Sequence, residues 1–206
     1  GVPLGILCAI FLAFFGSNRV AKIAKAGVQL LAGIPSVVYG FFGLVVLVPF
    51  IRENFGGTGQ SILCASLVLG IMILPTIITL SESALKAVPE AYYEGALALG
   101  ADHERSVMRV MLPAAISGVL ASIILAIGRA IGETMAVIMI AGNQVQMPDA
   151  ITDGIRTMTA NIVLEMGYAA DLHRGALIGT ACVLFVFILI INFAFSALKK
   201  KGRNNG

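Results

Sequence analysis

The 206-residue chain is 58% hydrophobic and only 12% charged, with a mean hydropathy of +0.95 and a formal net charge of +3. In ordinary soluble domains, about a quarter of the residues are charged. The composition therefore excludes an ordinary soluble domain and predicts a chain embedded in a lipid bilayer.

Long apolar segments recur along the chain, separated by more polar ones. At about 1.5 Å per residue, four of them are long enough to cross a hydrocarbon core of about 30 Å as helices. They occupy residues 28–51, 61–80, 114–141 and 175–198. A fifth run, residues 1–15, is shorter and begins without Met, so we expect the chain to start inside or just before a span. The predicted fold is an all-α, polytopic transmembrane helix bundle of about five spans.

Basic residues predict which side of the membrane each connecting segment faces. If residues 81–112 lie in the cytoplasm, then residues 16–27 and the tail 199–206 lie there as well. These three segments carry ten Lys and Arg residues, against three in the outer segments. The bias is the positive-inside pattern of a multi-pass membrane protein. It accounts for the net charge without a nucleic-acid partner.

The sequence presents no residue pattern typical of a catalytic, metal or nucleotide site. The three cysteines lie in predicted spans without metal-ligand spacing, so we expect them to pack as small apolar residues. His103 and His173 are predicted to be solvated on opposite sides of the bilayer, where neither can serve a catalytic serine. The stretch 56–61 is Gly-rich but lacks the Lys of a P-loop and is typical of a turn. The expected function is therefore not enzymatic.

Two charged residues fall inside the predicted span 114–141, in "GRAIGETMAV". In a continuous helix, Arg129 and Glu133 lie one turn apart on the same face. Charges at this depth cost about 2.5–3.5 kcal/mol each, so the pair must face protein or water. On one interpretation Arg129 offers its planar guanidinium to an anion that crosses the membrane, and Glu133 holds Arg129 in place. On the other, the two form a structural ion pair.

Residues 81–112 are predicted to form two short helices joined at a glycine. Pro89 suits a first helical position, and Gly100 is placed to end that helix in a left-handed cap. Asp102 can cap the second helix, which is expected to run to about residue 111. A helix–Gly–helix elbow of this kind offers a docking point for another protein. On the opposite side of the membrane, residues 142–174 are expected to hold one short helix at about 155–166.

The same loop resembles the EAA loop of permease subunits from ABC importers. The match consists of Glu94-Gly95-Ala96, then Gly100 after three residues, then Val110-Met111-Leu112-Pro113 after nine more. Gly95 and Val110 replace the family's Ala and Ile. The stretches "GIPSVVYGFFGL", "GRAIGETMAVIMIAGN" and "RTMTANIVLEMG" resemble the phosphate-specific importer, and its C-type permease more than its A-type partner. The similarity covers nearly the whole chain, and the family's first span and the outer segment after it are not found in it.

The resemblance implies a single permease domain over residues 1–206, of the type I ABC importer kind. It implies that the elbow is a coupling helix for a cytoplasmic ATPase, at Glu94, Gly95, Ala96, Gly100, Ala101 and Asp102. The implied substrate is inorganic phosphate, whose path Arg129 and Glu133 would line. No cofactor is expected on this chain, because ATP would act on the partner ATPase.

The implied assembly contains a second phosphate permease subunit, two ATPase subunits and, against the outer segments 52–60 and 142–174, an extracytoplasmic phosphate-binding protein. The resemblance implies that it lies in a bacterial or archaeal cytoplasmic (inner) membrane, surrounded by membrane lipid. Two alternatives stay open at this point. One is an ABC permease for another oxyanion, such as sulfate or molybdate; the other is an ion-driven secondary transporter.

Overall fold

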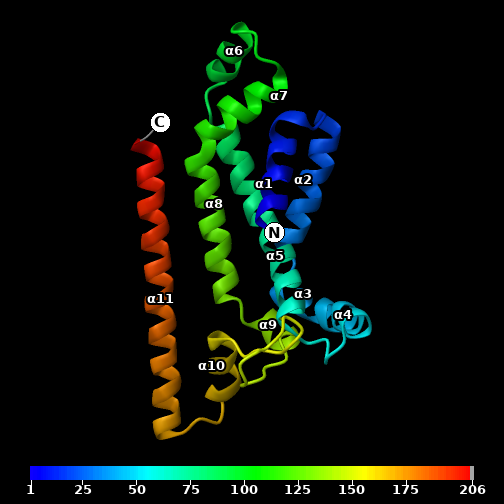
Figure 1. Cartoon of the computed structure of the whole chain (residues 1–206), viewed down its shortest axis with the longest axis vertical. Helices are drawn as coiled ribbons and strands as arrows, with labels where there is room; N and C mark the ends of the chain where they lie inside the picture. Colours follow the sequence, from blue (N-terminus) through cyan, green and yellow to red (C-terminus); the bar gives the residue numbers. More distant parts are fainter. Residues whose placement is uncertain (205–206) are drawn as a thin grey trace. The chain divides into compact units, whose positions relative to one another are not determined.

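The computed structural model describes residues 1–204, and the side chains of residues 1–194. Within that part the secondary structure is helical apart from one isolated bridge between Gly142 and Ile155, which confirms the predicted all-α class (Figure 1). The helices are α1 (Val2–Ile10), α2 (Asn18–Gly33), α3 (Ser36–Phe42), α4 (Val48–Phe55), α5 (Ile62–Lys86), α6 (Glu90–Ala98), α7 (His103–Ser106), α8 (Leu112–Gly132), α9 (Met135–Ile140), α10 (Met158–Met166) and α11 (Asp171–Asn204). Three π-helical turns continue them: η1 (Phe11–Phe15), η2 (Gly43–Leu47) and η3 (Val107–Met111). In the predicted tail 199–206, the side chains and residues 205–206 lie outside the described part.

Four helical segments are long and apolar enough to cross a membrane: Ser36–Phe55, Ile62–Lys86, His103–Gly132 and Asp171–Ala194. The apolar helix Val2–Phe15 is shorter. These segments confirm the four long predicted spans, two of which need corrected bounds, and the fifth predicted segment is the shorter helix.

The first correction concerns the predicted span 28–51, which is wrong as one helix. The chain leaves the helical conformation between α2 and α3, where Pro35 has the extended dihedral angles φ −60° and ψ 144°. A proline disfavours the helical conformation at the residue before it, here Ile34, so the apolar run breaks at this point. The span therefore begins at Ser36, and α2 is a separate amphipathic helix in which no residue is buried.

The second correction concerns the predicted span 114–141. Its helix begins earlier, at His103, and runs unbroken past Pro113 to Gly132; α9 is a separate short helix. A proline ring clashes with the carbonyl four residues before it. For Pro113 that carbonyl belongs to Arg109, inside the widened π-helical turn η3, and for Pro49 it belongs to Val45, inside η2. The π-helical turns thus let both helices continue through a proline.

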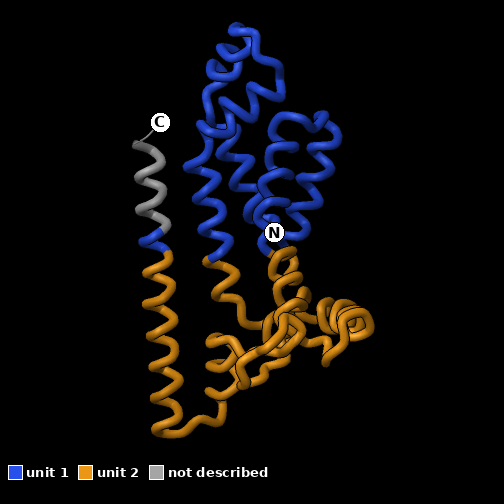
Figure 2. Tube along the Cα trace, viewed as in Figure 1, with its two compact units in different colours: residues 1–33, 73–127, 192–206 blue, residues 34–72, 128–191 orange. Residues whose placement is uncertain are grey.

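The chain divides into two compact units, each assembled from separated stretches (Figure 2). One unit contains residues 1–33, 73–127 and 192–206, and the other contains residues 34–72 and 128–191. The first unit has a core in which α1 packs with parts of α5, η3 and α8; its buried members are Ala9, Ile10, Leu85, Val107, Ala115 and Val119.

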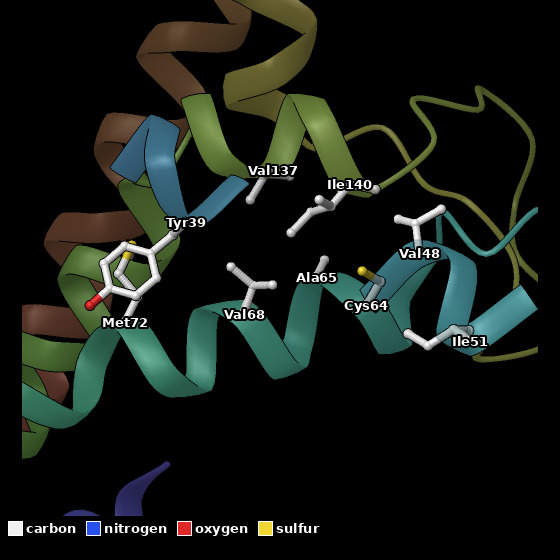
Figure 3. Close-up of a cluster of buried hydrophobic side chains, with 10 residues drawn as sticks. Tyr39, Val48, Ile51, Cys64, Ala65, Val68, Met72, Val137 and Ile140 are labelled. Carbon is white, nitrogen blue, oxygen red and sulfur yellow. The ribbon is translucent and has the colours of Figure 1, made fainter. Parts of the chain in front are cut away.

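The core of the second unit gathers side chains from the span Ser36–Phe55, the first half of α5 and α9 (Figure 3). Val68 and Ile140 lie near its centre, and Cys64 is fully buried in it. The packing role predicted for the cysteines is therefore confirmed for Cys64. Cys8 and Cys182 are exposed on this chain, and all three thiols are free.

Several glycines permit close helix packing inside the units. A Cβ on Gly40 of α3 would lie 2.7 Å from Cα of Ala136 in α9, and a Cβ on Gly118 of α8 would overlap the side chain of Ala84 in α5. In the described part of the chain, nothing beyond their chain neighbours and own helix backbone lies within 4 Å of a Cβ placed on Gly128 or Gly132. Gly40 and Gly118 therefore permit close packing inside the units, as do Gly5, beside Ile77, and Gly43, beside Val68.

Candidate functional site

The elbow between α6 and α7 is built by a glycine-terminated helix cap. Gly100 has φ +84°, the left-handed conformation that glycine adopts at low cost. Its amide donates to the carbonyl of Leu97 at 2.9 Å, and the amide of Ala101 donates to the carbonyl of Ala96 at 3.1 Å. These two bonds satisfy carbonyls that the end of α6 would otherwise leave free. The predicted left-handed cap at Gly100 is confirmed.

Asp102 starts the second arm of the elbow. Its carboxylate accepts a hydrogen bond from the amide of Arg105 at 2.7 Å, which confirms the predicted N-cap. The two arms are tied together by a 2.8 Å hydrogen bond between the Tyr93 hydroxyl and Nδ1 of His103. The His103 ring also meets the edge of Phe15. The prediction that His103 is solvated is therefore wrong, because its ring packs against Tyr93 of α6 and Phe15 of η1.

The tip of the elbow exposes an apolar side chain. Leu99 is 92% exposed, beside a groove whose lining is Ala96, Leu99, Ala101, Arg105, Arg109 and Val110. Glu94, Gly95, Gly100 and Asp102 are exposed around it, whereas Ala96 is buried and packs inward. The structure thus brings the six predicted coupling residues into one elbow. An exposed leucine with a basic rim is a surface that a protein partner could cover.

The structure does not pair Arg129 with Glu133. The helix ends at Gly132, so the prediction that the two share one helical face is wrong. Instead, the Glu133 carboxylate accepts a hydrogen bond from the amide of Ala136 at 3.1 Å, at the start of α9. The carbonyl of Glu133 accepts a hydrogen bond from Thr159 of α10 at 3.3 Å. Glu133 therefore stabilises the interruption between α8 and α9, where its carboxylate satisfies one backbone amide at the start of α9.

Arg129 lies exposed in the last turn of α8, where its charge complements the free carbonyls of the helix end. Among residues 1–194 no carboxylate forms an ion pair with it. Tyr39 of α3 lies within electrostatic range of the guanidinium. Within the part of the chain whose side chains are described, Arg129 is thus a cation in a membrane-spanning helix without a carboxylate partner.

A second polar cluster lies in the segment 142–174, beside α10. The Arg156 guanidinium donates to Glu165 at 2.7 Å, to Asn161 at 3.3 Å and to the carbonyl of Asn143 at 3.1 Å. His173 lies 3.8 Å from the other oxygen of Glu165. This network fixes the fold of the segment around the predicted short helix, which is confirmed with a start at Met158. The sequence predicts an outer position for Arg156 but not its partner, because Glu165 lies nine positions further along the chain.

Comparison with known proteins shows that the similarity to transport permeases extends beyond the elbow to nearly the whole chain. The family of binding-protein-dependent transport system inner membrane components matches residues 1–204. The probable ABC transporter permease protein YqgH of Bacillus subtilis is 40% identical over 96% of this chain and 66% of its own length. The phosphate transport system permease protein PstC of Haemophilus influenzae is 32% identical over 92% of this chain and 67% of its own length. The chain thus spans about two thirds of the length of these relatives.

Solved structures agree on the fold. The chain superposes on the inward-facing MetNI methionine ABC transporter with a TM-score of 0.72 at 22% identity, over 98% of this chain and 85% of that chain. It superposes on a bacterial alginate ABC transporter with a TM-score of 0.69 at 16% identity, over 96% of this chain and 73% of that chain. These neighbours confirm the predicted fold of a type I ABC importer permease. The chain therefore belongs to the family of binding-protein-dependent transport system inner membrane components.

Proposed function

We propose that this chain is the permease subunit of an ABC importer that carries inorganic phosphate across the bacterial inner membrane. The observation that carries the choice of phosphate is the identity of 32–33% with two proteins named PstC, each over 92% of this chain. The methionine and alginate transporters are no more than 22% identical and support the fold alone.

The chemistry of Arg129 supports an oxyanion as the substrate. A guanidinium offers paired N–H donors that match two oxygens of a phosphate, and it stays charged at any physiological pH. Because no described carboxylate neutralises Arg129, its charge is available to a passing anion. Glu133 then has a different role from the predicted one: it holds the break after α8 that sets the end of the Arg129 helix.

The exposed elbow supports the proposal that a separate ATPase subunit drives transport. We propose that Leu99 and the residues around Gly100 dock on a cytoplasmic ATPase, one of two that hydrolyse ATP beneath a pair of permease subunits. The second permease of that pair would face exposed apolar helix surfaces of this chain. A phosphate-binding protein would deliver the anion to the segments 52–60 and 142–174. In this arrangement the chain itself catalyses no reaction, and it moves between inward-open and outward-open states.

Uptake of radiolabelled phosphate tests the proposal. The full-length protein is reconstituted in proteoliposomes with its partner permease, ATPases and binding protein, with or without ATP on the ATPase side. We expect uptake only with ATP, and competition from unlabelled phosphate but not from a hundredfold excess of sulfate or molybdate. ATP-driven uptake that sulfate or molybdate blocks would assign the permease to that oxyanion instead. Uptake without ATP would mean a secondary transporter and would overturn the proposal.

A further inference from the structure

Two lysines share one buried carboxylate at the end of α5. Glu82 is only 5% exposed, and its Oε1 lies 2.7 Å from Nζ of Lys25, in α2, and 2.7 Å from Nζ of Lys86, one helical turn further along α5. The two lysine side chains are themselves 43% and 49% exposed. All three residues belong to the same compact unit. The carboxylate therefore holds two partly solvated ammonium groups next to each other.

This arrangement leaves one positive charge without a counter-charge. The single carboxylate can balance only one of the two ammonium charges. Because each Nζ lies 2.7 Å from the same Oε1, the two nitrogens are at most 2 × 2.7 Å apart. Each ammonium has three N–H donors, so contact with a single oxygen leaves further donors on both. The Glu82 carboxylate also raises the pKa of Lys25 above its ordinary value, which keeps that ammonium protonated. The pair retains a net charge of one and the donors to bind a second anion.

More positive charge lies along α2 on the same side. Arg19, Lys22 and Lys25 are spaced three residues apart, so at 3.6 residues per turn they share about a third of the helix circumference. Arg19 and Lys22 are exposed. By the distribution of basic residues, this end of α2 lies on the cytoplasmic side of the membrane. Arg19 and Lys22 add to the positive potential of α2, but only Lys25 and Lys86 are joined by Glu82.

We propose that Lys25 and Lys86, held together by Glu82, bind a phosphate group on the cytoplasmic side of the membrane. Two adjacent ammonium groups with free donors suit the oxygens of a tetrahedral oxyanion. If the group is the transported anion, the inference rests on the proposed function, and the site receives phosphate as it leaves the span. The same chemistry could come from the phosphate of an anionic lipid headgroup. Both sources present the same oxygens, and the test below separates them.

Chemical protection of individual lysines tests the site directly. The assembled transporter, with the full-length chain, is placed in nanodiscs of neutral phosphatidylcholine and treated with acetic anhydride, and acetylation of each lysine is followed by mass spectrometry. Saturating inorganic phosphate is expected to slow acetylation of Lys25 and Lys86 at least threefold. Lys22, which is exposed one turn away on the same helix, is the internal control and should react at an unchanged rate.

Variants separate binding from folding. Lys25→Gln leaves Glu82 paired with Lys86, so the buried carboxylate keeps a partner, and we expect phosphate to lose its protection of Lys86. Lys22→Gln makes the same change in charge one turn away and should keep that protection. Lys25→Arg restores the cation and should restore the protection.

The outcomes distinguish the two sources and the failure of the idea. Protection in neutral nanodiscs identifies free phosphate as the ligand. Protection only when anionic lipid replaces neutral lipid, without added phosphate, identifies a headgroup as the ligand. If neither condition protects Lys25 and Lys86 more than Lys22, the proposal is wrong. Labelling does not depend on uptake, so failure here leaves the proposed function standing, and failed phosphate uptake leaves a protected site standing.

Discussion

Arg129→Ala is expected to lower ATP-driven phosphate uptake by about 100-fold in a transporter that still assembles. Hydrogen bonds to charged groups contribute about 1.5–3 kcal/mol each, so loss of two guanidinium bonds to the anion costs at least about 3 kcal/mol, which is about two factors of ten. The fold should tolerate the change, because no described carboxylate pairs with Arg129 and none is left without its partner. Initial uptake rates in proteoliposomes measure the effect.

Two further variants show whether the charge or its geometry matters. Arg129→Lys keeps the cation but loses the planar fork, so we expect an intermediate rate, about 10-fold below that of the wild type. Lys22→Ala removes one exposed positive charge from α2 and should leave uptake unchanged. A wild-type rate for Arg129→Ala, with assembly verified, would mean that the anion path lies elsewhere.

Gly40→Ala is expected to destabilise the protein, because the added methyl group meets backbone atoms of α9. The added Cβ would lie 2.7 Å from the Ala136 Cα and 3.1 Å from both its carbonyl oxygen and the Met139 sulfur. Backbone atoms cannot rotate away as a side chain does, so α3 and α9 must separate. Overpacking of this kind costs about 1–3 kcal/mol. A thermal melt of the purified protein in detergent should show a transition lower by about 2–4 °C for each kcal/mol.

Gly27→Ala is the matched control for this change. Gly27 lies inside α2, and in the described part of the chain nothing beyond its own helix backbone and chain neighbours lies within 4 Å of a Cβ built there. Alanine is favoured over glycine inside a helix by about 0.5–1 kcal/mol, so the melting temperature should stay the same or rise. Equal transitions for the two variants would contradict the close packing of α3 on α9.

The sequence was sufficient for the elbow because its signals are local. A glycine with no Cβ at the end of a helix and an aspartate two residues later determine the turn on their own, and both formed as predicted. The bundle of apolar spans could be predicted for the same reason: the apolar runs are long enough to cross the membrane by themselves. The fold class therefore followed from residues that are neighbours in the chain.

The break after Gly132 could not be predicted in this way. Glu133 can either continue a helical turn or cap the next helix, and its own neighbours in sequence do not decide between them. The structure shows why the second arrangement holds: α9 packs against Gly40, which lies more than ninety residues earlier in the chain, and Thr159 binds the carbonyl of Glu133. The pairing of Lys25 with Glu82 is likewise a contact between distant segments. The break at Pro35 is a different case. The proline is itself a local signal for a break, but it lies inside an apolar run long enough to suggest one continuous span.

The proposed function requires that the elbow pass the motion of an ATPase to this permease. Retention of the ATPase subunit by the assembled permease pair, compared between Leu99→Asp and Leu172→Asp, tests this claim. The two leucines are almost equally exposed, at 92% and 89%, and are predicted on opposite sides of the membrane. We expect Leu99→Asp to weaken ATPase binding at least 10-fold, because a charge replaces a buried apolar contact, and Leu172→Asp to leave it unchanged. Equal retention by the two variants and the wild type would contradict the claim.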